Sequence, residues 1–315
     1  DHSYKIKSFS TTLGFSEYSW EDNGYITLYT CESKNDTYDR PIASAESPNG
    51  NIFTLELYGL PERYYYNSQL TTQTNTSSFW DPLPGYYTID STDSYAGDIV
   101  INIENNITYY YYLDHQEATI SKWSLDQISY IEEYPSIGID VARIAIDSSG
   151  FIYITCATTD ENDIFEHRVI KFDVSEGKDL SIGSKGVGQK QFNRPYGIAI
   201  DSDGNFYVSE VGNHRIQKFS PNWNFITMWG NYGTGDGEFN EPRDIAIDSN
   251  DFIYVADSLN ARIQKFDANG NFITKFGSYG YDDNQFQTPT SVSIDSTGRV
   301  IVTDYQAQQI KRFAI

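Results

Sequence analysis

Apolar residues alternate with small or polar ones along most of this chain, in short runs that turn residues separate. Within residues 194–219, Ile198, Ile200, Phe206 and Val208 show the alternation on either side of a Ser-Asp-Gly turn. An apolar period of two over such short runs is typical of half-buried β-strands, and tight turns between them indicate hairpins. The sequence therefore predicts an all-β fold of antiparallel strands.

The same pattern recurs at a fixed interval toward the C-terminal end. Segments that begin at residues 194, 241 and 288 are closely similar and start 47 residues apart. The first of them contains four strand candidates, at 197–201, 205–210, 215–219 and 225–229. A constant period of this length indicates a repeat architecture, with one four-stranded antiparallel sheet, or blade, for each copy.

The last copy contains three strand candidates and lacks the fourth. Near the start of the chain, Tyr4, Ile6 and Phe9 belong to a run that is similar to the fourth strand of the preceding copy. We expect this N-terminal strand to complete the last blade, by pairing with the strand that carries Ile310 and Phe313. Such a pairing closes a ring and removes exposed sheet edges.

Earlier copies are less regular, and the turns between their first and second strands fall near residues 23, 105, 149, 203, 250 and 297. These turns predict a six-bladed β-propeller that occupies residues 1–315 as a single domain. The longest interval includes residues 59–97, which are rich in Tyr, Ser, Thr and Asn. We interpret 59–97 as one long inserted loop, and the alternative is a seventh, degraded blade. Loops of this length are usually functional or disordered.

A family resemblance follows from the repeated motif. Residues 195–201 and 207–219 fit the pattern P-x-[GD]-I-A-I-D followed by Y-V-[AS]-[DE]-x-x-N-x-R-I-Q-K-F, which resembles the NHL repeat family. The segment that gives this family its name reads Asn213-His214-Arg215 here. The resemblance implies a β-propeller, commonly six-bladed and closed by a shared first and last blade. It leaves function open, because such relatives include scaffolds, RNA-binding proteins with a basic face, and lyases or hydrolases with a metal in the central channel.

The charge of the chain narrows the classes of partner. Lys and Arg number 22 against 44 Asp and Glu, which gives a formal net charge of −22. Nucleic-acid binding relies on cationic contacts to phosphates, so a nucleic-acid partner is not expected. An anionic membrane surface is disfavoured for the same reason. No segment is apolar enough to be inserted in a membrane.

Cysteine and histidine are scarce. Cys31 and Cys156 are too few for a disulfide scaffold or a thiolate metal site, and we expect buried thiols, with a bridge between them as the alternative. Zinc-dependent relatives in the family use histidines. The four histidines here are not expected to converge on a zinc ion, because three of them are predicted to lie outside the inner strands. The four are His2, His115, His167 and His214. No cofactor is therefore expected, and calcium belongs to the enzyme alternative given below.

Two sets of acidic residues recur in the clear copies. One closes the first strand, where Asp bonds its own backbone in a turn, and a calcium or active-site role is the alternative. The other closes the second strand and precedes Arg215 or Arg262, which predicts an ion pair within the blade. Recurrence in successive copies favours a structural role. The Gly-rich stretches such as 230–239 are interpreted as connections between blades in which Gly supplies positive φ. The two sets are Asp147, Asp201, Asp248 and Asp295, and Glu210, Asp257 and Asp304.

Surface chemistry supplies the remaining candidate residues. Three Asn-x-Ser/Thr sequons lie in predicted connections, at Asn35, Asn75 and Asn106, and are glycan acceptors if the chain is exported. Successive strand residues point to opposite faces, so only half of the run at 109–112 can share one face. Aromatic residues are interpreted either as buried between blades or as a patch that faces carbohydrate or protein. The candidates are Tyr64, Tyr65, Tyr66, Trp80, Tyr110 and Tyr112.

These observations predict a non-enzymatic protein that is extracellular or on the cell surface. It would act as a structural or adhesive subunit or as a binding platform for protein or carbohydrate. Self-assembly into a filament would follow if the strand at residues 4–9 were added to the last blade of a neighbouring copy. The alternative is a lyase or hydrolase with its site, and a calcium ion, in the central channel. A third hypothesis is a ligand-binding domain of a larger surface receptor.

Overall fold

The computed structural model describes residues 25–30, 38–46, 52–60, 63–73, 96–104, 107–114, 120–124, 129–134, 141–156, 167–173, 178–307 and 309–314. In these residues the chain consists of β-strands and turns, with one short 3-10 helix, η1 (Ser258–Asn260). None of the described helical structure is long and apolar enough to cross a membrane. The predicted all-β class is confirmed.

The described strands form five sheets of four strands and one of three, with antiparallel pairing throughout. The three-stranded sheet contains β2 (Tyr38–Glu46), β3 (Ile52–Leu60) and β4 (Arg63–Gln73). The next sheet along the chain contains β5 (Ala96–Glu104), β6 (Ile107–Asp114), β7 (Ile120–Ser124) and β8 (Ser129–Tyr134). It is followed by β9 (Val141–Ile146), β10 (Ile152–Cys156), β11 (Arg168–Asp173) and β12 (Lys178–Ile182).

The three remaining sheets correspond to the three clear sequence copies. The first contains β13 (Pro195–Ile200), β14 (Phe206–Glu210), β15 (Arg215–Phe219) and β16 (Phe225–Trp229). The second contains β17 (Pro242–Ile247), β18 (Ile253–Asp257), β19 (Arg262–Phe266) and β20 (Phe272–Phe276). The last combines β21 (Pro289–Ile294), β22 (Val300–Asp304) and β23 (Gln309–Phe313) with β1 (Tyr25–Thr30).

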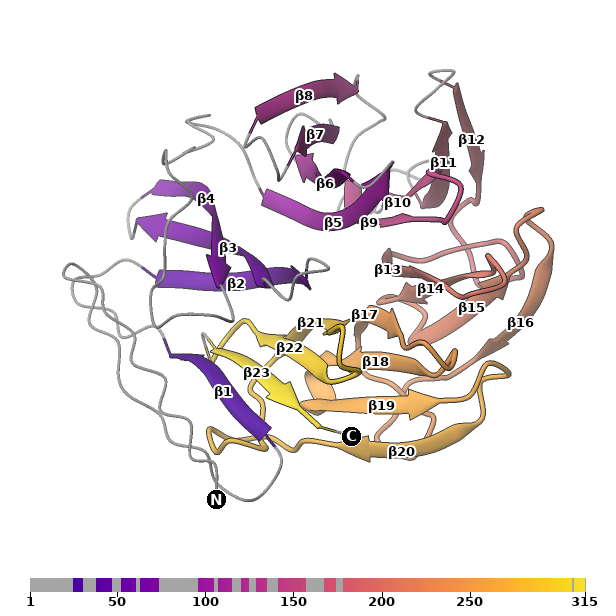
Figure 1. Cartoon of the computed structure of the whole chain (residues 1–315). Helices are drawn as coiled ribbons and strands as arrows, with labels where there is room; N and C mark the ends of the chain where they lie inside the picture. Colours follow the sequence, from indigo (N-terminus) through magenta and orange to yellow (C-terminus); the bar gives the residue numbers. More distant parts are fainter. Residues whose placement is uncertain are drawn as a thin grey trace.

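These sheets surround a common centre, as Figure 1 shows. The inner strand of each sheet contacts the inner strand of the next, in the order β2, β5, β9, β13, β17 and β21, and β21 contacts β2. Four-stranded antiparallel sheets arranged in this way form a β-propeller. The inner strands therefore bring residues from distant repeats close together around the centre.

The last sheet is completed by a strand from the N-terminal part of the chain, but by a different one from that predicted. β1 pairs antiparallel with β23, so that Tyr25 faces Phe313 and Tyr29 faces Ile310. Both edges of β23 are therefore occupied, by β22 and by β1. The prediction that Tyr4, Ile6 and Phe9 pair here is wrong, and these three residues lie outside the described part of the chain. Both N-terminal runs have strand-like composition, and composition does not determine which of them reaches the last sheet.

Residues 59–97 also differ from the prediction. Arg63–Gln73 is not loop but strand β4, and its pairing with β3 places Leu70 opposite Leu55. The run is rich in Tyr and Thr, which favour strands, and the inserted-loop interpretation gave too little weight to that preference. Ala96, at the other end of the interval, already belongs to β5. The residues between these two strands lie outside the described chain.

The core lies between neighbouring sheets. Tyr153 and Val169 of one sheet pack against Phe206 and Phe219 of the next in a single cluster of buried residues. The sheets β9–β12, β13–β16 and β17–β20 are thus covered on both faces, and β10, β14, β18 and β22 are buried at every position. Tyr111 is buried in an equivalent cluster and Tyr109 packs against the same cluster, so these two share a face as predicted.

Candidate functional site on the inner strands

The aspartates that close the first strand of each copy have a structural role, as predicted. Oδ1 of Asp201 accepts the backbone N–H groups of Asp203 and Asn205, at 3.1 and 2.8 Å. Oδ2 accepts the Tyr207 hydroxyl at 2.9 Å and lies 3.3 Å from Nζ of Lys218. Both carboxylate oxygens therefore hold the turn and two neighbouring strands. Equivalent bonds form at Asp147 and Asp248.

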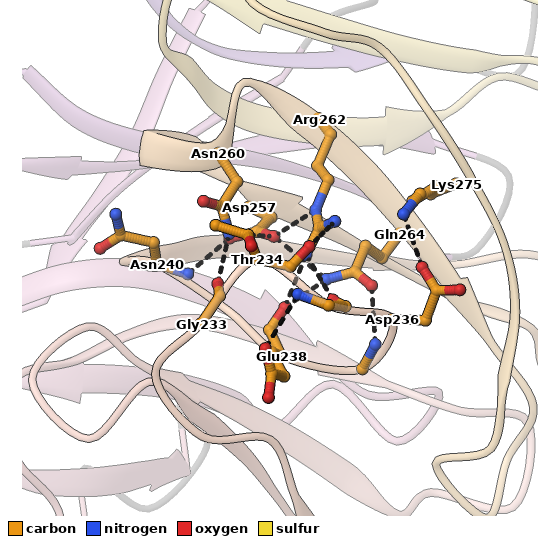
Figure 2. Close-up of polar contacts among 12 residues, drawn as sticks. Gly233, Thr234, Asp236, Glu238, Asn240, Asp257, Asn260, Arg262, Gln264 and Lys275 are labelled. Carbon is orange, nitrogen blue, oxygen red and sulfur yellow. Dashed lines mark hydrogen bonds and ion pairs between the residues drawn. The ribbon is translucent and has the colours of Figure 1, made fainter.

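The acids that close the second strand bind a buried arginine, also as predicted. Figure 2 shows this network around Asp257, whose Oδ2 lies 2.7 Å from Nε of Arg262. The Arg262 guanidinium donates in turn to the carbonyls of Thr234, Gly235 and Glu238, at 2.7, 2.8 and 2.9 Å. Burial raises the pKa of Asp257, while hydrogen bonds and the charge of Arg262 oppose the rise. The ion pair thus anchors the Gly-rich loop that leads to the next sheet.

The neighbouring copies repeat this anchor, with one exchange of residue types. Arg215 pairs with Glu210 and donates to carbonyls of the preceding Gly-rich loop. In the last copy, Gln309 stands in place of the arginine. There Nζ of Lys311, two residues further along the same strand, donates to the carbonyls of Asp282 and Gln285. Residues two apart lie on one face of a strand, so the cation reaches the same loop from a shifted position.

Glycine has the predicted role in these loops. Gly230 has φ +99°, and a Cβ built there would lie 2.5 Å from Cδ2 of Phe239. Gly183 and Gly277, at the matching positions, also have positive φ. The loops are thus tight connections in which side chains are excluded at the first residue.

Two histidines bond neighbouring sheets together. Nδ1 of His167 accepts the backbone N–H of Arg194 at 3.0 Å, and Nδ1 of His214 accepts that of Glu241 at 3.1 Å. Burial lowers the pKa of His214, against the charges of Glu241 and Asp257. His2 and His115 lie outside the described residues.

One position of the inner strands does not repeat. The position four residues before the turn that ends the first strand varies among five copies. Two of the five residues are acidic, one is basic, one is a glycine and one is a serine. In order along the chain they are Asp98, Arg143, Gly197, Asp244 and Ser291.

The two acids at this position join inner strands of neighbouring sheets. Oδ2 of Asp98, on β5, accepts the backbone N–H of Ile144 on β9 at 2.9 Å. Oδ2 of Asp244, on β17, accepts that of Val292 on β21 at 3.0 Å. Both side chains are buried. Each carboxylate therefore links one sheet to the next.

Arg143 lies buried within reach of both acids. Burial alone would lower its pKa, but Tyr196, Asp98 and Asp244 together raise it. The centre of its guanidinium is 4.8 Å from the ring centroid of Tyr196, and that of Arg243 is 5.9 Å from the same ring. Tyr196 is thus in cation–π contact with arginines from the sheets on either side.

Gly197 allows this close arrangement. A Cβ at this position would lie 2.5 Å from the carbonyl oxygen of Arg243 and 2.7 Å from Cα of Asp244. Inner strands β13 and β17 therefore approach more closely here than any side chain would permit. The glycine thereby brings Tyr196 and Arg243 together.

One arginine of the cluster is buried and the other is partly exposed to solvent. Arg143 is buried, whereas the side chain of Arg243 is 27% exposed and lies 3.3 Å from the carboxylate of Glu241. A guanidinium, a phenol and a carboxylate at one place offer hydrogen-bond donors and acceptors to a polar ligand. No group of three metal-ligating side chains occurs among the described residues. Calcium does not fit between Asp98 and Asp244, because the guanidinium of Arg143 already supplies positive charge there.

Sequence reasoning did not single out this cluster. It searched for residues that recur, and these five were the departures from the repeat. The signal was the change of residue type at two adjacent positions of an otherwise regular strand motif. Their convergence depends on the closed arrangement of sheets and leaves no local pattern. The five are Asp98, Arg143, Tyr196, Arg243 and Asp244.

The other candidate residues are only partly placed. Tyr64, Tyr65 and Tyr66 belong to β4, and Tyr110 and Tyr112 belong to β6 of the neighbouring sheet. The structure describes their backbone and not their side chains. Trp80 and the sequon residues Asn35, Asn75 and Asn106 lie outside the described residues.

Comparison with known proteins supports the predicted family. The NHL repeat model matches residues 192–219 and 239–266. Two segments of the chain therefore match the NHL repeat. These two matches run from the end of a Gly-rich loop to the end of the third strand, so each includes an acid–arginine pair described above. No curated protein matches the sequence.

Solved structures with similar folds are also β-propellers. A streptogramin B lyase is 13% identical, with a TM-score of 0.61, and the match covers 92% of this chain and 98% of that one. A protein of unknown function from Bacteroides thetaiotaomicron is 13% identical, with a TM-score of 0.63 and 99% and 76% coverage. A putative gluconolactonase is 10% identical, with a TM-score of 0.61 and 92% and 91% coverage. At identities this low, the comparison shows that this chain has the same fold as these proteins, and no more.

Proposed function

We propose that this NHL repeat propeller is a non-enzymatic binding platform for a protein or carbohydrate ligand. The observation that carries the proposal is the state of the inner-strand cluster. Asp98 and Asp244 are occupied by backbone N–H groups and balance the charge of Arg143. Arg243 and Tyr196 are left half-buried at the surface of the cluster. Fixed polar groups of this kind favour recognition over proton transfer or nucleophilic attack.

The test is a binding screen with the full chain. Labelled protein is applied to a glycan array and to an array of extracellular proteins, beside the double variant Arg243→Ala/Tyr196→Ala. We expect one or more ligands to be retained by the wild type and lost by the double variant, whose melting temperature should change little. The absence of any ligand for the wild type would contradict the binding platform. Ligands that bind both proteins equally would contradict the assignment of the contact surface to Arg243 and Tyr196.

We further infer that each sheet is one blade, so that the ring has six. The contacts of the inner strands, which lead from β2 round to β21 and back, support this count. The three-stranded sheet β2–β4 is then the blade that precedes the long interval to β5. An experimental density map that shows another sheet between β4 and β5 would support seven blades instead.

The same proposal places the chain outside the cell or on its surface. Its support is the acidic composition, with a net charge of −22, and the three sequons. Asn35, Asn75 and Asn106 would then carry glycans. Intact mass of protein from its native cells should fall after treatment with an N-glycosidase. An unchanged mass would remove the support that the sequons give.

Self-assembly by strand addition now requires a different geometry. Because β1 already covers the free edge of β23, a strand at residues 4–9 must displace β1 or join another sheet edge. The outer strands β16 and β20 are such edges. Deleting residues 1–10 should abolish filaments seen by electron microscopy and leave a folded monomer. Filaments that persist in the deletion variant would exclude this route.

The enzyme alternative has one specific observation in its favour. The charged side chains that differ between repeats converge on the inner strands, and two of the similar folds are a lyase and a putative gluconolactonase. A channel enzyme that uses calcium should purify with stoichiometric metal and lose thermal stability in a chelator. Neither result is expected, since Arg143 lies where the acids would otherwise attract a cation.

A further inference from the structure

Three tyrosines on the Gly-rich loops point away from the core. Tyr232, on the loop at 230–240, is 68% exposed, and Tyr279 and Tyr281, on the loop at 277–287, are each 72% exposed. By contrast, Tyr207 and Tyr254, on the second strands of two regular repeats, are buried between sheets. Exposing a large ring forgoes the stabilisation that burial provides, so three such rings on one type of loop require an explanation.

The loops hold these rings in a fixed and repeated position. Tyr232 forms a parallel backbone bridge with Phe239, and Tyr279 forms the same bridge with Phe286. Each phenylalanine is fully buried while the tyrosine opposite it faces outward. The two tyrosines are 47 residues apart and occupy the same position in consecutive repeats.

The anchors described above make the display rigid. Three carbonyls of the first loop are bound by Arg262, as Figure 2 shows, and two carbonyls of the second are bound by Lys311. The Tyr232 ring also packs edge-on against His214, with centroids 5.0 Å apart. A preformed loop loses little conformational entropy when a ligand binds.

The loops that carry these rings also carry carboxylates and amides. Oε1 of Glu238 accepts a hydrogen bond from the side-chain amide of Asn231 at 3.3 Å. Asp236 forms an ion pair with Lys275 at 2.6 Å (Figure 2), and both side chains are exposed. The second loop carries Asp282 and its neighbouring acid. These groups accept and donate hydrogen bonds in the way that sugar hydroxyls require. The net charge of −22 disfavours a polyanionic ligand.

We propose that Tyr232, Tyr279 and Tyr281 form a binding rim for a neutral polysaccharide. The apolar C–H face of a sugar ring stacks on the tyrosine, and its hydroxyls bond to the carboxylates and amides beside it. A protein partner is less suited, because the centres of protein interfaces are depleted in Asp and Glu. Tyr232 and Tyr279 occupy the same position in consecutive repeats, and a polymer of repeating sugars can contact several such sites at once. Contact with several sites raises the overall affinity. This inference rests on the proposed binding function and assigns the ligand class and a second contact surface.

The experiment is affinity electrophoresis of the full chain in native gels that contain mannan, β-glucan, dextran or starch. At least one polysaccharide should retard the wild type. The triple variant Tyr232→Ala/Tyr279→Ala/Tyr281→Ala should be weakened by about tenfold or more. The matched control is Ile226→Ala/Ile273→Ala, which removes exposed apolar residues from β16 and β20 and should be retarded as the wild type is. Melting curves of all variants show whether each is folded.

A triple Tyr→Phe variant separates stacking from the hydroxyl groups and should retain most of the retardation. Retardation that the triple alanine variant keeps would overturn the rim. So would the absence of retardation by every polysaccharide, even if a protein ligand bound these loops. Loss of binding in Arg243→Ala/Tyr196→Ala alone would leave the platform in place and move the carbohydrate site to the inner strands. The proposed function fails only when neither glycan nor protein binds.

Discussion

The acid–arginine anchors and the inner-strand cluster contain similar charged residues but differ in how they relate to the repeat. Around Asp257 and Glu210, the same partners occur at the same positions in successive repeats. On the inner strands, Asp98, Arg143 and Asp244 occupy matching positions with different chemistry. Recurrence therefore marks a charge that holds the fold together. On the inner strands, the acids Asp98 and Asp244 instead link particular pairs of neighbouring sheets.

The last copy refines this lesson. Its acid, Asp304, accepts the backbone N–H groups of Gln287 and Thr288, while Lys311 takes over the bonds to the loop. The interaction of a buried cation with loop carbonyls recurs, although a lysine at a different position provides the cation in the last copy. Repeats are therefore better compared by their contacts than by their residue types.

The largest effect is expected from an anchor arginine. Arg262→Ala leaves Asp257 buried without its cation and removes three hydrogen bonds to loop carbonyls, of which that of Thr234 has no other donor among the described contacts. We expect a loss of about 3–5 kcal/mol in the free energy of unfolding, measured by denaturant titration. Lys275→Ala, which breaks the exposed ion pair of the same repeat, is the control and should leave the curve nearly unchanged. Equal losses in the two variants would contradict the distinction.

The glycine at the start of the loop should rank second. Gly230→Ala combines φ +99° with a Cβ 2.5 Å from the ring of Phe239. Unfavourable backbone conformation and displacement of a buried ring should together cost about 1–3 kcal/mol. Gly237→Ala has φ +80° and open space around the new Cβ, so it isolates the backbone contribution. Calorimetric melting of the two variants should show the smaller loss for Gly237→Ala.

A cluster arginine should contribute little to stability. Arg243→Ala removes a guanidinium that is 27% exposed in its side chain, against 7% for Arg262. We expect less than about 1 kcal/mol of destabilisation, because the charge is partly solvated and its partner Glu241 remains in contact with water. Denaturant titrations of Arg243→Ala and Arg262→Ala under the same conditions test this expectation, because both variants replace an arginine by alanine. A large loss for Arg243→Ala would make the cluster part of the framework.

The smallest effect concerns pH. The folded chain holds the pKa of His214 below its usual value, so the unfolded chain binds the proton more readily. The stability from this residue is present above about pH 6.5 and is lost as pH falls through the folded-state pKa. His214→Asn keeps a residue that tolerates φ +52° but does not titrate, and its melting temperature should change less with pH over that window. Parallel pH profiles would show that this histidine does not contribute.

The clear repeats were predictable because every local signal in them agrees. The expected strands at 215–219 and 225–229 coincide with β15 and β16. Alternating apolar residues, turns that begin with Asp and loops that begin with Gly each mark the start or end of a strand there. The turn aspartates and the arginine pairs followed from the same regularity.

Long-range choices were not predictable in the same way. Residues 4–9 and Tyr25–Thr30 both resemble strands, and the pairing of Tyr25–Thr30 with β23 depends on contacts far away in sequence. Arg63–Gln73 has the Tyr and Thr content of a strand, but its pairing with β3 depends on contacts between separate segments of the chain. The cluster of Arg143 with Tyr196 and Asp244 required the sheets to be in place before its members could be seen as neighbours.

The pairing of β1 with β23 has a consequence for how the molecule is made. Tyr25 leaves the ribosome long before its partner Phe313 is synthesised. During that time the edge residues of β1 are without their final hydrogen bonds and are open to aggregation, and the ring has no means of closing. Bringing the two strands together is a highly non-local step, which slows folding. Biogenesis of this protein should therefore depend on chaperones that shield an early strand until translation is complete.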